Sequence, residues 1–212
     1  VDIAPDSRIS GNYYPAVHEF SLYADFPSLR WKHYLHEGLA INLASDDSTA
    51  KLETASRMFE AGSRIKLENL NLEAYAVRDE FGYNLNWDNK GSDRLNLGNM
   101  SGQADFQYRG KHTIPRIMLR MDPGEVIIRD TSWQLAASEV IIDSSEFRFD
   151  DFRVSHEKQI LEIEGIISEN PEEKLNLSFS NLNLAQFNDA LNGMQLSGII
   201  NGSSTVSGIY EN

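Results

Sequence analysis

The sequence predicts an all-β protein, mostly antiparallel, whose sheet is curved and rolled into an open trough and carries one or two short helices. Three observations support this fold class. Apolar and polar residues alternate with a period of two, turn-forming residues separate the alternating blocks, and the blocks recur about every ten residues. Two parts are expected: residues 1–62, a divergent β-rich repeat or the N-terminal part of the same sheet, and residues 63–212, a β-repeat region.

The expected strands follow one another closely from residue 63 onward. Turn material such as DNKGSD and DPGE lies between them, as in an antiparallel meander. The alternating blocks are, in order, RIKLE, NLNLEAYAV, YNLNW, QADFQY, RIMLRM, EVIIRD, SEVIIDS, EFRFD, ILEIEGII and LNLSF.

Two segments predict helices. Residues 48–61 contain KLETASRMFEA, which is rich in good helix formers, and Gly62 would end that helix. Residues 183–191 place Leu184, Phe187 and Leu191 at helical spacing, with Asn-Gly directly after them.

The parity of the alternation changes inside some blocks. Leu177 and Phe179 give way to Leu182 and Leu184, and a similar change follows Leu67. A β-bulge or a strand corner at these points would keep the apolar set on one face, and it would bend the strand. The parity changes therefore predict a curved sheet.

Composition excludes several functional classes. The chain has 212 residues, with 19 basic and 32 acidic side chains and a formal charge of -13, so its field repels nucleic acids, and no nucleic-acid partner is expected. It contains no cysteine, which excludes disulfides and thiolate chemistry. Neither a stretch of roughly 18 apolar residues nor a signal-peptide core occurs. We expect a soluble fragment cut from a longer precursor.

Catalytic motifs are missing from the sequence. It has no P-loop, no GxGxxG and no GxSxG, so neither enzymatic activity nor a cofactor is expected. His33 and His36 have a spacing that suits two metal ligands on a helix, but zinc needs three or four ligands, and no metal site is expected. The acidic pairs at 46–47 and 150–151 resemble glycosidase carboxylates only in composition, because adjacent acids are usually solvated turn charges.

The three tryptophans suggest a different ligand. Exposed side by side, Trp31, Trp87 and Trp133 would form stacking platforms for sugars. Their positions in strand-like alternation favour a place in the core. A carbohydrate-binding β-domain is therefore retained as an alternative that requires two tryptophans on one exposed face beside a carboxylate pair.

Four segments in the second half of the chain form an ordered set of motifs. They are DTSW at 130–133, HEKQILEIEGIIS at 156–168, NLNLAQFNDAL at 181–191 and LSGIINGSSTVSG at 196–208. In this order they resemble the repeating body of TamB-like proteins, the translocation and assembly module subunits of the AsmA-like superfamily. The resemblance extends over residues 63–212. Each motif is degenerate, and the order carries the specificity.

This resemblance implies a function and a location. It implies a periplasmic segment of a longer protein that is anchored in the inner membrane of a diderm bacterium. Family members are implicated in phospholipid transport between the two membranes and in outer-membrane biogenesis. The implied partners are phospholipid acyl chains and a BamA/TamA-like outer-membrane assembly protein.

The apolar positions of the strands suit that function physically. A strand whose alternate residues are apolar must hide one face from water, either within the sheet or against an acyl chain. A sealed core in a closed sandwich is the alternative role for the same residues, and a scaffold that binds client proteins by strand pairing is the alternative function. The candidate groove residues are Ile117, Leu119, Phe147, Phe149, Leu175, Leu177 and Phe179.

Overall fold

The computed structural model describes residues 1–62, 65–89, 94–107, 116–186 and 195–208. These residues form 16 β-strands and contain no α-helix. All strand pairs with a defined register are antiparallel. The prediction of an all-β, antiparallel fold is thus confirmed. The chain divides into two compact units.

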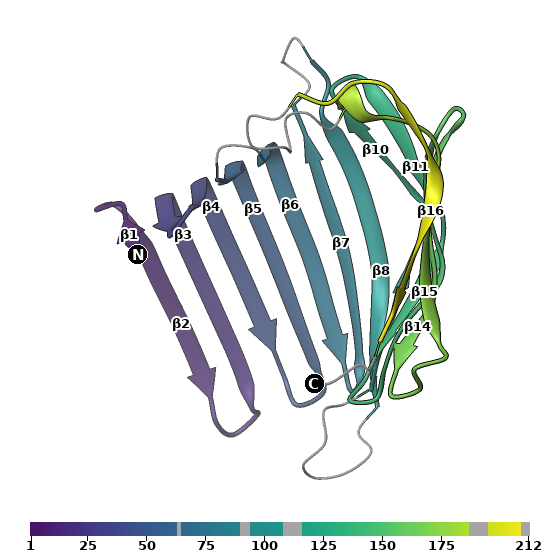
Figure 1. The fold of residues 1–212 in the computed structure, drawn as a ribbon. Helices are drawn as coiled ribbons and strands as arrows, with labels where there is room; N and C mark the ends of the chain where they lie inside the picture. The colour runs from purple at the N-terminus through teal and green to yellow at the C-terminus, as the bar shows by residue number, and fades with distance from the viewer. Residues whose placement is uncertain (63–64, 90–93, 108–115, 187–194, 209–212) are drawn as a thin grey trace. The chain divides into compact units, whose positions relative to one another are not determined.

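Unit 1 comprises residues 1–101 and 127–130. From β3 to β7 each strand pairs with the next one along the chain, and β1 and β2 both pair with β3. Figure 1 shows β2 to β7 side by side in a single layer. The strands are β1 (Asp2–Ile3), β2 (Arg8–Tyr14), β3 (Glu19–Trp31), β4 (Tyr34–Ser45), β5 (Thr49–Ala61), β6 (Ile65–Val77), β7 (Glu80–Asp88) and β8 (Leu97–Gln107), which runs on into unit 2.

Unit 2 comprises residues 102–126 and 131–212. The second half of β8 pairs with β9, β9 with β12, and β12 with β13, after which β13 to β16 pair in chain order. Strand β11 also pairs with β13, beyond the part that β12 covers. The strands are β9 (Arg116–Met121), β10 (Gly124–Ile128), whose last two residues belong to unit 1, β11 (Thr131–Leu135), β12 (Ser138–Ile142), β13 (Glu146–His156), β14 (Gln159–Ser168), β15 (Lys174–Asn183) and β16 (Ile199–Ser207).

The helix predicted over residues 48–61 is wrong. This segment is β5, paired along its length with β4 on one side and β6 on the other, and Leu52 lies between Leu43 and Ala74. Two ladders of backbone hydrogen bonds outweigh helix propensities of a few tenths of a kcal/mol per residue. Because β5 joins β4 to β6, residues on both sides of position 62 belong to one sheet.

The second predicted helix is present only as a single 3₁₀ turn at residues 184–186 within the described chain. The rest of the predicted segment, residues 187–191, lies outside the described residues. A 3₁₀ turn is a common end to a longer element or a connector between strands.

The bulge predicted in β15 is confirmed. The register with β16 shifts by one residue between Phe179 and Leu182, and Asn181 in the bulge has a φ of 50°. β13 has a similar shift between Phe149 and Phe152. The change of parity in β6 involves no bulge. Asn69 instead adopts a φ of 48°, and the register with β5 does not shift.

Candidate functional site

The groove candidates predicted from the sequence lie on one face of unit 2. Directly opposed residues of an antiparallel pair point to the same side of the sheet. Leu119 on β9 is opposite Val140 on β12, Val140 is opposite Phe149, Phe149 is opposite Gly165, and Gly165 is opposite Leu175. This row crosses five strands and contains three of the seven candidates.

The remaining four candidates lie in rows on either side of the first. The rows are Ile117, Ile142, Phe147 and Ile167; then Phe152, Ile163 and Leu177; then Val154, Leu161 and Phe179. Ring contacts agree with this placement, since the centroids of Phe147 and Phe149 are 5.0 Å apart and those of Phe149 and Phe152 are 5.9 Å apart. We call these four rows the apolar face of unit 2.

The two bulges keep this face apolar. In β13, Asp150 and Asp151 occupy the bulge, and Asp151 adopts a φ of 56°. The extra residue carries the chain from Phe149 to Phe152 without moving either ring to the other face. The acidic pair at 150–151 therefore has a structural role in the strand.

The apolar face is partly accessible to solvent. Leu175 is buried, and the other six candidates are half-buried. No large side chain in the described part of the chain is fully buried. A sealed sandwich would contain fully buried residues between its two layers. These burial values therefore favour an accessible face over a sealed core.

Sequence reasoning missed Gly165, which lies in the middle of this face. Its φ is +118°, and a Cβ atom there would overlap the carbonyl oxygen of Lys174. Only glycine tolerates both conditions. The row thus lacks a side chain between Phe149 and Leu175. The signal in the sequence is the glycine inside the block ILEIEGII.

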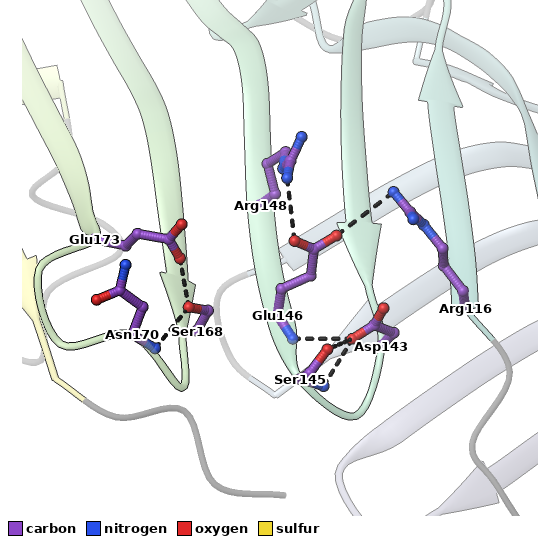
Figure 2. Close-up of polar contacts among 8 residues, drawn as sticks. All are labelled: Arg116, Asp143, Ser145, Glu146, Arg148, Ser168, Asn170 and Glu173. Atoms are coloured by element: carbon purple, nitrogen blue, oxygen red, sulfur yellow. Dashed lines mark hydrogen bonds and ion pairs between the residues drawn. The ribbon is translucent and has the colours of Figure 1, made fainter.

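The opposite face of unit 2, which we call the polar face, carries ion pairs. Glu146 lies between two guanidinium groups, 3.5 Å from Arg116 and 3.1 Å from Arg148, as Figure 2 shows. Arg153 and Glu162 form a further pair at 3.6 Å. In one row of the same face, Arg148 lies between Ile141 and Ile166, and Met118 follows Ile141.

Two turns next to this cluster are held by side chains. Asp143 accepts hydrogen bonds from the backbone N–H of Ser145 at 2.7 Å and from that of Glu146 at 2.9 Å. In the turn between β14 and β15, Ser168 donates to Glu173 and accepts from the backbone N–H of Asn170 at 2.9 Å. Such side-chain contacts are typical of structural turns.

Three open cavities lie in unit 1, away from the groove candidates. Their volumes are about 250, 390 and 410 Å³. The second is lined by Ala40, Asn42, Glu53, Thr54, Ala55, Asn71, Glu73 and Asn86. The second cavity is lined mainly by polar surface, whereas the first and the third present more apolar than polar surface, and all three are open to solvent.

The tryptophans do not form a shared platform. Trp31 is 55% exposed, whereas Trp133 is only 7% exposed. Trp87 is half-buried and donates a hydrogen bond from its indole N–H to Asn96 at 3.1 Å. The condition set for carbohydrate binding, two tryptophans on one exposed face beside a carboxylate pair, is not met.

The histidines and acids singled out in the sequence have structural surroundings in unit 1. His36 lies on β4, 3.2 Å from the hydroxyl of Ser56, and burial lowers its pKa. Hydrogen bonds from the backbone of Ser48 and from Thr49 lower the pKa of Asp46 in the turn before β5. In the described part of the chain, no three His, Cys, Asp or Glu side chains are grouped to hold a metal ion.

None of the helical segments within the described residues has the length and apolar character needed to cross a membrane. Comparisons with protein-family models, with curated proteins and with solved structures found no match. The resemblance to TamB-like proteins therefore stays a prediction from the sequence motifs.

Proposed function

We propose that unit 2 holds phospholipid acyl chains against its apolar face. In this proposal the protein is a non-catalytic, periplasmic segment of a TamB-like protein that serves phospholipid transport between membranes and outer-membrane biogenesis. One observation carries the proposal: all seven residues predicted to contact lipid share one face, in continuous rows across β9, β12, β13, β14 and β15.

The physical basis is the hydrophobic effect. Removing one methylene group from water contributes about 0.8 kcal/mol, so an acyl chain is held without any specific polar contact. Half-buried Phe, Leu and Ile side chains leave apolar surface available for it. Because such contacts have no direction, a chain can slide along the rows at little cost.

The contrast between the two faces of the sheet supports the same function. The apolar face presents rows of Phe, Leu and Ile side chains. The opposite face carries charged side chains in ion pairs, of which Arg153–Glu162 is about half exposed. The two faces therefore differ in chemistry as a lipid-holding sheet requires.

The first experiment is lipid extraction. Residues 1–212 are directed to a bacterial periplasm, the purified protein is extracted with organic solvent, and phospholipid is measured by mass spectrometry. We expect near-stoichiometric phospholipid. A lipid-free extract from folded protein would contradict the proposal and would favour the scaffold that binds a client by strand pairing, with the BamA/TamA-like protein as a candidate client.

Matched variants on the two faces localise the lipid. A photoreactive amino acid at Leu177, on the apolar face, is expected to crosslink phospholipid. The same group at Ser180, which is exposed on the polar face of the same strand, is expected not to do so. Leu177→Asp should also lower bound lipid, with Ser180→Asp as control, because a charge there is costly to cover with an acyl chain.

A further inference from the structure

Two exposed tyrosines lie on the same side of unit 1. Tyr23 on β3 is 44% exposed, and Tyr75 on β6 is 46% exposed. Tyr23 is opposite Asn42, which is in turn opposite Glu53 on β5. Tyr75 is opposite Lys51, two residues from Glu53 on the same strand, so both tyrosines belong to one side of the sheet. We call this side the tyrosine face; its strands β3 to β7 each have a neighbouring strand on both sides.

The three open cavities of unit 1 adjoin on the tyrosine face. The first and the third share Ala44 and Lys51 in their linings. The first and the second share Asn42 and Glu53. One of the two tyrosines lines the first cavity, and the other lines the third. The cavities therefore form one open groove that has an aromatic ring on either side.

The tyrosine rings provide platforms for stacking. The Tyr75 ring lies across Gly82, so one side of the ring covers the backbone while nearly half of the residue stays exposed. Between the tyrosines, Ser21 is opposite Ala44, and these small side chains leave the space of the groove. The Cβ atoms of Tyr23 and Tyr75 are three strands and one row apart, roughly 16 Å. A single sugar ring is shorter than this span, and a short oligosaccharide matches it.

Asparagine side chains supply oriented polar groups in the groove. Asn71 donates from Nδ2 to Oδ1 of Asn86 at 3.2 Å, and Asn86 donates in the same way to Asn84 at 3.4 Å. Asn42, Asn71 and Asn86 line the second cavity. A carboxamide has two N–H donors and an acceptor oxygen. Amides held in this way can bind neighbouring hydroxyl groups of a sugar, which also donate and accept hydrogen bonds.

The charges of the tyrosine face disfavour anionic ligands. Glu53 is directly opposite Glu73, and Lys51 forms an ion pair with Glu53 at 2.5 Å. Like charges opposite each other destabilise a sheet, and departures of this kind are typical of functional sites. Two carboxylates beside one ammonium group leave a negative charge that repels phosphates and acidic sugars. A neutral ligand that donates hydrogen bonds to the carboxylates is favoured.

We propose that the groove binds a neutral oligosaccharide, with sugar rings stacked on Tyr23 and Tyr75 and with hydroxyl groups bound by the amides and carboxylates between them. The tryptophans form no shared platform, and the tyrosines take that role. An acyl chain does not suit this groove, because amides and carboxylates line it. The site lies in unit 1, so this inference goes beyond lipid binding by unit 2 and does not depend on it.

Isothermal titration calorimetry of residues 1–212 tests the proposal with four neutral pentasaccharides, namely cellopentaose, maltopentaose, chitopentaose and mannopentaose. We expect at least one of them to bind at one site per chain. The corresponding monosaccharide should bind at least about tenfold more weakly, because it reaches one ring only. Pentagalacturonic acid should not bind, because the carboxylates of the groove repel it.

Variants of the tyrosines locate the sugar. Tyr23→Ala and Tyr75→Ala should each weaken binding about five- to tenfold, whereas Tyr23→Phe should retain it, because the ring remains. Tyr13→Ala is the matched control and should leave the affinity unchanged. Tyr13 is 59% exposed, but it is opposite Phe20 and lies on the other side of the sheet from Tyr23. Circular dichroism checks that every variant is folded.

Three results would overturn the proposal. The first is folded protein that binds none of the four neutral pentasaccharides. The second is an affinity that both tyrosine-to-alanine variants leave unchanged. The third is pentagalacturonic acid bound as tightly as the neutral sugars. Phospholipid content, measured by solvent extraction, should be the same in all of these variants, so a failure of this proposal is distinguishable from a failure of lipid binding.

Discussion

The ring of Tyr75 on β6 lies across Gly82 on β7. The two residues are directly opposed in the register, and a Cβ atom at Gly82 would overlap the Tyr75 ring. Glycine inside a strand normally weakens it, because it adds backbone entropy and contributes no side chain to packing. Here an aromatic side chain from the neighbouring strand covers the gap.

This relationship predicts a coupled pair of substitutions. Gly82→Ala should lower the free energy of unfolding by at most about 1 kcal/mol, because the methyl group displaces only the outer end of the half-exposed Tyr75 ring. In a Tyr75→Ser background the same change should cost much less. Chemical denaturation of the four proteins in the cycle measures the coupling, and equal costs in both backgrounds would show that the ring does not occupy this space.

Gly165 provides a second test, in the apolar face of unit 2. Gly165→Ala combines a strained φ of +118°, which costs about 1–3 kcal/mol, with overlap of the Lys174 carbonyl. Gly198 is the matched control, since its φ is +104° and a Cβ there meets no atom within 4 Å. Thermal denaturation should show a larger loss for Gly165→Ala, and the difference between the two variants measures the backbone overlap.

The cluster around Glu146 on the polar face predicts an unequal response to charge removal. Glu146→Gln takes the carboxylate away from two guanidinium groups that are largely covered, with side chains 21% and 33% exposed. We expect a loss of about 1–3 kcal/mol in the free energy of unfolding. Arg153→Ala breaks an ion pair whose side chains are about half exposed, and it should cost about 0–1 kcal/mol. Similar losses would indicate that the cluster is fully solvated.

His36 predicts the pH dependence of unit 1. Burial lowers its pKa in the folded state, so the unfolded chain binds the proton more readily than the folded one. The contribution of His36 to the free energy of unfolding is therefore fully present above the ordinary pKa of about 6.5. It is lost as the pH falls below that value, towards the folded pKa. His36→Phe should remove this part of the acid sensitivity, measured by urea denaturation between pH 7.5 and 5. His33→Gln, in the exposed turn, should retain it.

Strands with clear alternation were predictable from the sequence, and the reason is local. Period-two patterns such as YNLNW and ILEIEGII leave one face apolar, and only a strand presents that pattern to one side. The bulge in β15 was predictable too, because the change of parity between Phe179 and Leu182 requires an extra residue. The groove candidates were recognisable as apolar positions of such strands.

Other features depend on which strands become neighbours. The segment 49–61 has helix-forming composition, but pairing with β4 and β6 makes it a strand. Asp150 and Asp151 read as turn charges, yet they form the bulge of β13 because β14 continues past them. No local pattern shows that Gly82 is covered by Tyr75.

The sequence by itself thus determined an antiparallel β protein and the set of residues with apolar side chains, because alternation is a local property of the chain. The tertiary structure decided that Leu119, Phe149 and Leu175 share one row, and that β9 pairs with β12 and not with the next strand along the chain. Both depend on register and strand order. Those are set by contacts between residues far apart in the chain, which the local pattern does not encode.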